Sequence, residues 1–147
     1  MFKHLLVPTD GSELSQKSSQ NAVIFAKEIN AKITGLYVKP DYPLFYFGEA
    51  VAIDHQAIDD FTQIANKQAK EYLEYIKNLC EENKIKYSSE ISEGGNIYEE
   101  IINTAEKNKC DLIYMASHGR GGISGFLLGS ETQKVLTHSK IPILVYR

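Results

Sequence analysis

The chain has 147 residues, of which 43% are hydrophobic and 24% are charged, and its formal charge is −3. A chain of this length and balance can bury a sufficient core without a disulfide or a structural metal. The acidic balance argues against a broad nucleic-acid face but leaves room for a local basic site, and no apolar run approaches the ~20 residues of a membrane span. We therefore expect one cytoplasmic domain over residues 1–147, with no nucleic-acid partner and no membrane partner.

Short apolar runs alternate with segments of helical spacing along the chain. The apolar runs predict five strands, at residues 5–7, 33–38, 85–91, 112–116 and 143–146. The helical spacing predicts four helices, at residues 14–29, 58–80, 97–105 and 130–137. Strands that alternate with helices pair in parallel through right-handed crossovers. The pattern predicts an α/β fold, with a doubly wound five-stranded parallel sheet and helices on both faces.

The stretch from residue 39 to 57 has no clean period, and it contains Tyr42, Phe45, Tyr46 and Phe47. Long irregular loops in compact domains often serve as lids or binding loops. The alternative is that these aromatic side chains pack over the edge of the core. The sequence leaves both interpretations open.

Three predicted helix starts carry residue pairs with capping-box spacing. The pairs are Asp10 with Glu13, Asn96 with Glu99, and Ser130 with Gln133. We therefore expect the first residue of each pair to cap its helix.

The two cysteines, Cys80 and Cys110, belong to neither a CxxC motif nor a Cys/His cluster. Isolated cysteines of this kind predict reduced thiols in a cytosolic protein, and they argue against a zinc or redox site. We therefore assign no metal-ligating residue.

Two loops leave the predicted sheet where a ligand is expected. In doubly wound sheets, ligands bind outside the carboxyl ends of the strands, where the strand order reverses. Residues 8–12 follow the first strand, and residues 117–129 follow the fourth. Asp10 in the first loop is therefore a candidate ligand contact as well as a candidate cap.

The second loop has the composition of a phosphate cradle. Glycines permit close backbone approach, and the free N–H groups of a helix N-terminus favour an anion. Ser130 adds a hydroxyl, and Arg120 can add a charge-assisted contact. The alternative is a flexible turn in which His118 is a hydrogen-bonded turn residue. The glycines of this loop are Gly119, Gly121, Gly122, Gly125 and Gly129.

This loop matches neither of the two common phosphate motifs. No lysine precedes Ser130 as a Walker loop requires, and a GxGxxG frame from Gly119 and Gly121 ends on Ser124. The Walker lysine, a metal-binding carboxylate pair and a positioned base are the parts that hydrolysis normally uses. We therefore assign no catalytic residue and expect at most slow ATP hydrolysis.

The sequence resembles the universal stress protein family over its whole length. The family's nucleotide motif is G-x2-G-x9-G-S/T, and here its positions are Ala116, Gly119, Gly129 and Ser130, with alanine at the first glycine. The other matching segments are LLVPTDGS, LYV, DLIYMASHGRGG, LLGSETQKVL and IPILVYR.

This resemblance implies a homodimer with strand order 3-2-1-4-5 and ATP as the usual ligand. It implies that Pro8, Thr9 and Asp10 lie beside the adenosine and that Val38 meets the adenine through its backbone. It also implies that Ala116 and Gly119 flank the ribose and phosphates. The phosphate chain, with Mg²⁺ or Mn²⁺, would then lie against Gly129, Ser130 and Glu131. His118 and Arg120 of the same loop complete the predicted binding set for ATP, ADP or AMP.

Three functions remain in competition at this point. The first is a stress-response or signalling dimer that binds an adenine nucleotide. The second is an adenylyl-transfer enzyme, which would carry a phosphate loop after the first strand, where only Gly11 stands. The third is a dimeric interaction module of the same fold that does not bind ATP. The apolar terminal strand 143–146 would be an exposed sheet edge in a monomer, which predicts dimerisation through it.

Overall fold

The structure is a computed structural model, and it describes residues 1–41, 46–47, 50–51, 54–120 and 128–147. Its main sheet has five parallel strands in the order β5-β2-β1-β6-β7. These strands are β1 (His4–Pro8), β2 (Lys32–Lys39), β5 (Tyr87–Glu93), β6 (Leu112–Ala116) and β7 (Ile143–Tyr146). Two short extra strands precede β5, so this order is the expected 3-2-1-4-5, and the predicted sheet is confirmed.

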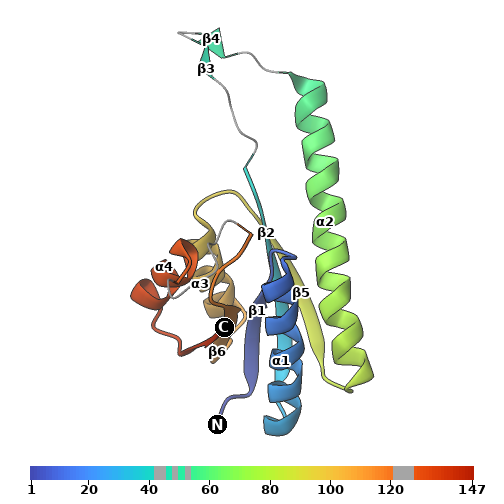
Figure 1. Ribbon diagram of the computed structural model, residues 1–147, viewed down its shortest axis with the longest axis vertical. Coiled ribbons are helices and arrows are strands. Elements are labelled where there is room, and N and C mark those ends of the chain that lie inside the picture. Colours follow the sequence, from blue (N-terminus) through green and yellow to red (C-terminus); the bar gives the residue numbers. More distant parts are fainter. Residues whose placement is uncertain (42–45, 48–49, 52–53, 121–127) are drawn as a thin grey trace.

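Four helices cover the two faces of this sheet (Figure 1). They are α1 (Glu13–Ile29), α2 (His55–Glu82), α3 (Ile97–Lys107) and α4 (Ser130–His138). Helices α1 and α2 pack on one face, and α3 and α4 pack on the other. The predicted doubly wound arrangement is confirmed. Within the described residues, no helix is both long enough and apolar enough to cross a membrane.

The central strand β1 shows how an apolar run serves two cores. Leu5 and Val7 pack with α1 on one face, whereas Leu6 packs with α3 and α4 on the other. All three side chains are at most 1% exposed. Full burial of such a side chain contributes roughly 1.5–3 kcal/mol, so β1 anchors both layers. The loop after β1 therefore begins at a strand whose position is fixed by packing on both faces.

The segment from residue 39 to 57 contains structure that the sequence did not predict. Strands β3 (Tyr46–Phe47) and β4 (Ala50–Val51) form a separate antiparallel pair. Helix α2 begins at His55, three residues before the predicted start, because the Asp54 carboxylate accepts hydrogen bonds from the first-turn amides of the helix. The aromatic side chains of residues 42–47 lie outside the part of the chain whose side chains the structure describes. The N-terminal part of α2 extends beyond the end of the sheet (Figure 1).

Of the three predicted caps, only Asn96 occupies the cap position of its helix. Ser12, not Asp10, caps α1, and its hydroxyl accepts from the N–H of Ser15 at 3.2 Å. Asn96 stands at the cap position of α3 without a side-chain capping bond. The cap residue of α4 is Gly129, so Ser130 is the first residue of that helix.

Candidate functional site

A pocket of about 770 Å³ opens at the carboxyl ends of β1 and β6, which is the point where the strand order reverses. It brings together all eleven residues of the predicted binding set. They are Pro8, Thr9, Asp10, Val38, Ala116, His118, Gly119, Arg120, Gly129, Ser130 and Glu131. Gly121, Gly122 and Gly125, which we also expected in the cradle, lie outside the described residues.

The loop after β1 is held by its own short side chains. The Thr9 hydroxyl hydrogen-bonds the Ser15 hydroxyl at 2.8 Å and accepts from the N–H of Gly11 at 3.2 Å. The Asp10 carboxylate accepts from the N–H of Ser12 at 3.0 Å. Gly11 has a φ of 75°, a conformation that glycine adopts without the usual Cβ penalty. These bonds fix Thr9 and Asp10 at the pocket wall.

The loop after β6 is joined to the loop after β1 by two hydrogen bonds, both donated by Arg120 to Asp10. The second Asp10 carboxylate oxygen accepts from the backbone N–H of Arg120 at 2.8 Å. The Nε–H group of Arg120 donates to the backbone oxygen of Asp10 at 3.0 Å. Between them stands Gly119, where an added Cβ would overlap the Asp10 carboxylate. The two loops therefore form a single wall only if residue 119 has no side chain.

The start of α4 forms the opposite wall. The Gly129 N–H donates to the backbone oxygen of Ser117 at 2.8 Å, and a Cβ on Gly129 would lie 3.0 Å from His118 Cα. As a glycine, Gly129 offers no side chain to the first amides of the helix, which have no partner inside the helix. These amides belong to Ser130 and its neighbours, which line the pocket. This end of α4 is suited to an anion.

Ala116 carries its methyl group without backbone strain. It is the last residue of β6, and its φ is not among the positive values found at described residues other than glycine. Its carbonyl accepts a hydrogen bond from the Thr132 hydroxyl at 3.1 Å. The replacement of the family's glycine by alanine is therefore sterically harmless to the backbone at this position.

The charged residues of the pocket mostly face protein partners. The Glu131 carboxylate accepts from the N–H of Tyr98 at 3.0 Å and pairs with Lys134 at 2.9 Å. This engagement explains how an acid can stand beside an anion site. His118 hydrogen-bonds the Ser117 hydroxyl through Nδ1 at 3.2 Å, as expected of a turn histidine.

Two tyrosines in the neighbourhood of the pocket were missed by the sequence analysis. Tyr72 of α2 hydrogen-bonds the Arg120 guanidinium, which also stands 5.4 Å from the centre of its ring. Tyr37 of β2 lines the pocket and meets the Tyr72 ring edge-on at a centroid distance of 5.6 Å. Burial raises the pKa of the Tyr37 hydroxyl, and Tyr72 adds to this rise. No local signal distinguishes Tyr72 from a core residue, because only tertiary packing brings α2 to the loop.

Metal and thiol chemistry have little support among the residues that the structure describes. Those residues contain no cluster of three or more His, Cys, Asp or Glu side chains that could hold a metal ion. Cys80 and Cys110 are buried and unpaired, and burial raises the pKa of both thiols to about 12. A thiol that stays protonated is a poor nucleophile and a poor metal ligand.

The fold defines a doubly wound α/β protein, and its pocket lies at the β1/β6 edge, where such folds bind ligands. The model of the Universal stress protein family matches residues 1–147. Universal stress protein MJ0531 of Methanocaldococcus jannaschii is 31% identical over 147 residues, which cover 100% of this chain and 83% of that protein. Universal stress protein YxiE of Bacillus subtilis is 30% identical over 149 residues, and both chains are covered completely. The chain belongs to the universal stress protein family.

Solved structures of this family share the fold. Universal stress protein UspA from Lactobacillus plantarum has a TM-score of 0.79 at 22% identity and covers 99% of this chain and 98% of its own. A universal stress protein in complex with cAMP has a TM-score of 0.70 at 21% identity, with 99% and 97% covered. A family member from Arabidopsis thaliana with AMP bound has a TM-score of 0.67 at 15% identity, with 97% and 90% covered.

Proposed function

We propose that this protein binds an adenine nucleotide in the pocket at the β1/β6 edge and acts as a stress-response or signalling protein in the cytoplasm. The observation that carries the proposal is the convergence of all eleven predicted residues on one pocket of about 770 Å³. A cavity of this size suits a ligand of nucleotide dimensions. The buried, protonated thiols of Cys80 and Cys110 agree with a reducing compartment.

The two sides of the pocket suit the two ends of a nucleotide. The apolar side is formed by Val38, Ile97, Ile101 and Met115, and it suits a purine base. The polar side is formed by the start of α4 and the loop of Asp10, and it suits ribose hydroxyls and phosphates. Two relatives of the same fold are described with cAMP and with AMP, which supports an adenine ligand here.

ATP is the nucleotide we favour, with ADP and AMP as alternatives. The phosphate chain would lie against the backbone of Gly129 and Ser130, because the start of α4 has no side-chain cap for its first amides. Mg²⁺ or Mn²⁺ would come with the phosphates, since the chain's own carboxylate beside them, Glu131, already pairs with Lys134. We expect slow hydrolysis at most, because a Walker lysine is missing from the loop.

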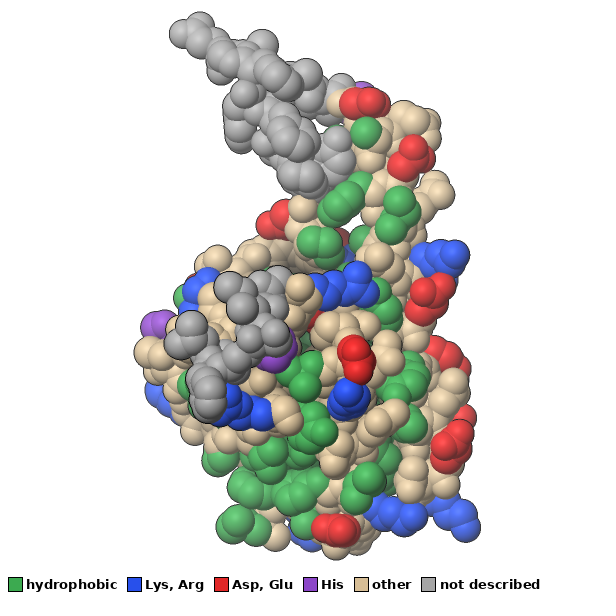
Figure 2. All heavy atoms as spheres, in the orientation of Figure 1, with side chains coloured by type: hydrophobic (Ala, Val, Ile, Leu, Met, Phe, Trp, Pro, Cys, Tyr) green, Lys and Arg blue, Asp and Glu red, His purple; other side chains and the backbone are tan. Residues whose placement is uncertain are grey.

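We also propose that the protein is a homodimer formed through β7. This strand is at one edge of the sheet and is paired with β6 alone. An apolar strand with an open edge associates readily with another strand. In the view of Figure 2, hydrophobic side chains gather on the side of the molecule that carries the C-terminus. The half-buried Leu144 and Tyr146 of β7 and the 55% exposed Ile24 of α1 are apolar residues that a partner could cover.

The decisive experiment has two steps. The protein is purified without added nucleotide and denatured, and any released small molecule is identified by mass. It is then titrated with Mg-ATP in parallel with Gly129→Val, whose side chain would project towards His118. We expect the variant to lose at least about tenfold in affinity, which is about 1.4 kcal/mol.

Thr137→Val is the matched control for this titration. It adds valine to the same helix at its far end, where Thr137 is exposed and bonds only its own helix. Circular dichroism confirms that both variants are folded. Equal affinity in the wild type and in Gly129→Val would show that the pocket is not the site. An empty protein that also gives no heat with Mg-ATP would favour the interaction module without nucleotide.

A further inference from the structure

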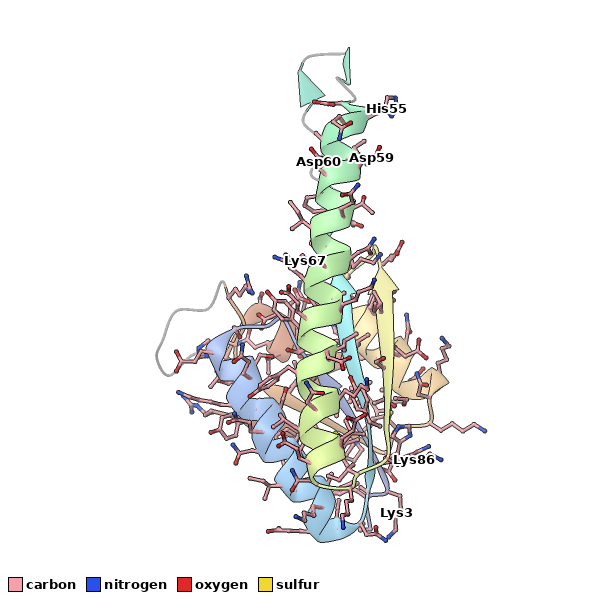
Figure 3. All side chains as sticks on the ribbon, turned by 90° about the vertical axis from the view of Figure 1, so that its right-hand side faces the viewer. Lys3, His55, Asp59, Asp60, Lys67 and Lys86 are labelled. Atoms are coloured by element: carbon pink, nitrogen blue, oxygen red, sulfur yellow. The ribbon has the colours of Figure 1, made fainter. Side chains whose placement is uncertain are left out.

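A second hollow, of about 470 Å³, lies where α1 and α2 end and where β1, β2 and β5 begin. This is the amino end of the sheet, opposite the proposed nucleotide site. We call it the lysine pocket. Five of its ten lining residues are Lys3, Lys27, Lys32, Lys84 and Lys86, and the rest are Ala26, Asn30, Ala31, Asn83 and Ile85. Figure 3 shows Lys3 and Lys86 at this end of the molecule.

The five lysines come from four segments of the chain, and the strand ladder fixes the spacing of three of them. Lys3 precedes β1, Lys32 opens β2 and Lys86 precedes β5. The Lys32 N–H donates to the Lys3 carbonyl at 3.0 Å, and the Ile33 N–H donates to the Lys86 carbonyl at 3.0 Å. Neighbouring strands lie about 4.8 Å apart, so three ammonium groups originate from a row of adjacent strand starts.

None of these five lysines forms an ion pair with a described residue. The seven ion pairs in the described part of the chain use six other lysines. No acidic residue lines the lysine pocket. The nearby Asp111 carboxylate accepts instead from the backbone N–H groups of Lys3 and His4. The Lys27 ammonium contacts only a neutral group, the Asn83 side-chain oxygen at 3.1 Å.

Ordinary helix chemistry explains only part of this cluster. Lys27 in the last turn of α1 and Lys84 just after α2 are positioned to complement the negative ends of their helix dipoles. The three lysines at the strand starts have no such role. Like charges that line one pocket repel one another, and these five exposed lysines line one pocket in a chain whose net charge is −3. A bound anion would remove this repulsion.

We propose that the lysine pocket binds a linear polyphosphate group, either as inorganic polyphosphate or as the tail of a nucleoside polyphosphate. The pocket lies at helix carboxyl ends, which present carbonyls, so it has no fixed N–H cradle for a single phosphate. Its donors are flexible ammonium groups spread over three strands and two helix ends. Such donors recognise several charges along a chain better than one compact anion.

The test uses two triple variants with the same change in charge. Lys32→Gln/Lys84→Gln/Lys86→Gln removes three lysines of the pocket. Lys70→Gln/Lys109→Gln/Lys140→Gln removes three exposed lysines that lie outside it and form no ion pair with a described residue. Both are made in the Gly129→Val background, so that binding at the β1/β6 edge does not contribute. The probe is sodium tripolyphosphate, titrated by calorimetry at low ionic strength.

We expect the pocket variant to bind tripolyphosphate about tenfold more weakly and the control to stay within about twofold of its background. Orthophosphate should bind at least about tenfold more weakly than tripolyphosphate. Equal losses in the two triple variants would overturn the proposal, because binding would then follow net charge alone. Equal affinity for orthophosphate would also overturn it. A titration with ATP in place of tripolyphosphate separates the two sources. If the pocket variant binds ATP more weakly than the control, the pocket accepts the tail of a nucleoside polyphosphate; if the two variants bind ATP equally, the ligand is inorganic polyphosphate.

A second measurement needs no variant. Lysine acetylation of the wild type is followed by mass spectrometry with and without tripolyphosphate. Protection of Lys32, Lys84 and Lys86 but not of Lys70, Lys109 and Lys140 is the expected result. Uniform protection, or none, would count against the pocket. A short DNA duplex that protects the same lysines more strongly than tripolyphosphate would overturn the proposal in favour of a nucleic-acid contact.

Discussion

The Asp10 carboxylate accepts a hydrogen bond from the backbone N–H of Arg120 at 2.8 Å, although 110 positions separate the two residues. The Arg120 side chain also donates a hydrogen bond, from Nε to the Asp10 carbonyl, at 3.0 Å. The loop after β1 and the loop after β6 are therefore one structural unit. Any change at either residue should act on both loops of this pocket wall.

The substitution Asp10→Ala removes the acceptor for the amides of Ser12 and Arg120. Loss of a hydrogen-bond acceptor typically costs about 1–3 kcal/mol, so we expect a decrease of that order in the free energy of unfolding. Nucleotide affinity should fall at least about tenfold, because the two loops separate. Urea unfolding and nucleotide titration measure the two effects.

Glu13→Ala is the matched control for Asp10→Ala, since it removes one carboxylate of the same sign from the start of α1. Glu13 is exposed and pairs only with Lys17. It should leave nucleotide affinity unchanged. Equal affinities for both variants and the wild type would mean that Asp10 is only a loop residue.

Tyr72→Ala removes the ring that meets the Arg120 guanidinium and stands against Gly11. We expect a loss of about 3 kcal/mol in stability and a weaker nucleotide affinity, because both loops lose their support from α2. Tyr75→Ala, one turn away, removes a similar ring whose hydroxyl accepts a hydrogen bond from the Gln20 side chain. If Tyr75→Ala weakened nucleotide binding as much as Tyr72→Ala, the effect would be one of stability alone.

The sequence was sufficient for the five-stranded sheet, because four of its strands are short apolar runs between breakers and β5 carries Tyr87 and Ile91 among polar residues. Leu5, Leu6 and Val7 illustrate this, since a continuous apolar run is what a strand covered on both faces requires. Strand ends and glycine spacing, which are local properties of the chain, pointed to Asp10 and to the loop after β6, whereas Val38, Ala116 and Glu131 were predicted from the family resemblance.

The parts that the sequence did not predict depend on contacts between distant segments. Asp10 is a residue type that commonly caps helices, but its carboxylate accepts a hydrogen bond from the Arg120 amide, and Ser12 caps α1 instead. Tyr72 follows the spacing of a core helix, and only the packing of α2 brings it to Arg120. The lysine pocket was also missed, because only the fold brings Lys3, residues 27–32 and residues 84–86 together.

The buried His4 should make stability depend on pH. Burial and the charge of Lys32 lower its pKa from the ordinary value of 6.5, and its Nε2 hydrogen-bonds the Thr34 hydroxyl at 2.7 Å. The unfolded chain therefore binds the proton more readily than the folded one. The free energy of unfolding therefore has its full value above about pH 6.5, the ordinary pKa of histidine. It decreases as the pH falls from there through the lower pKa of His4 in the folded protein, by up to about 1.4 kcal/mol per pH unit.

Urea unfolding between pH 7.5 and 5 measures this slope. His4→Gln cannot take up the proton, so its stability should fall less steeply over this range. His138→Gln, at the exposed end of α4, is the control and should keep the wild-type slope. Parallel curves for the wild type and His4→Gln would refute the assignment to His4.

The dimer proposal can be tested with a single proline in β7. The carbonyls of Pro142 and Tyr146 accept from the N–H groups of Ile113 and Ser117, at 2.9 and 2.7 Å. Backbone groups alternate in direction along a strand, so the N–H of Val145 points to the open edge. Val145→Pro removes that donor while the bonds to β6 remain, and proline is tolerated at such edge positions.

We expect Val145→Pro to be folded but to dissociate at concentrations where the wild type is a dimer, as measured by light scattering after size exclusion. Val145→Thr is the control, because it keeps the N–H and the β-branched shape, and it should remain dimeric. A wild type that is monomeric at micromolar concentration would reject the dimer. A dimer that is unaffected by the proline would place the interface elsewhere, because strand pairing at β7 cannot continue past a missing donor.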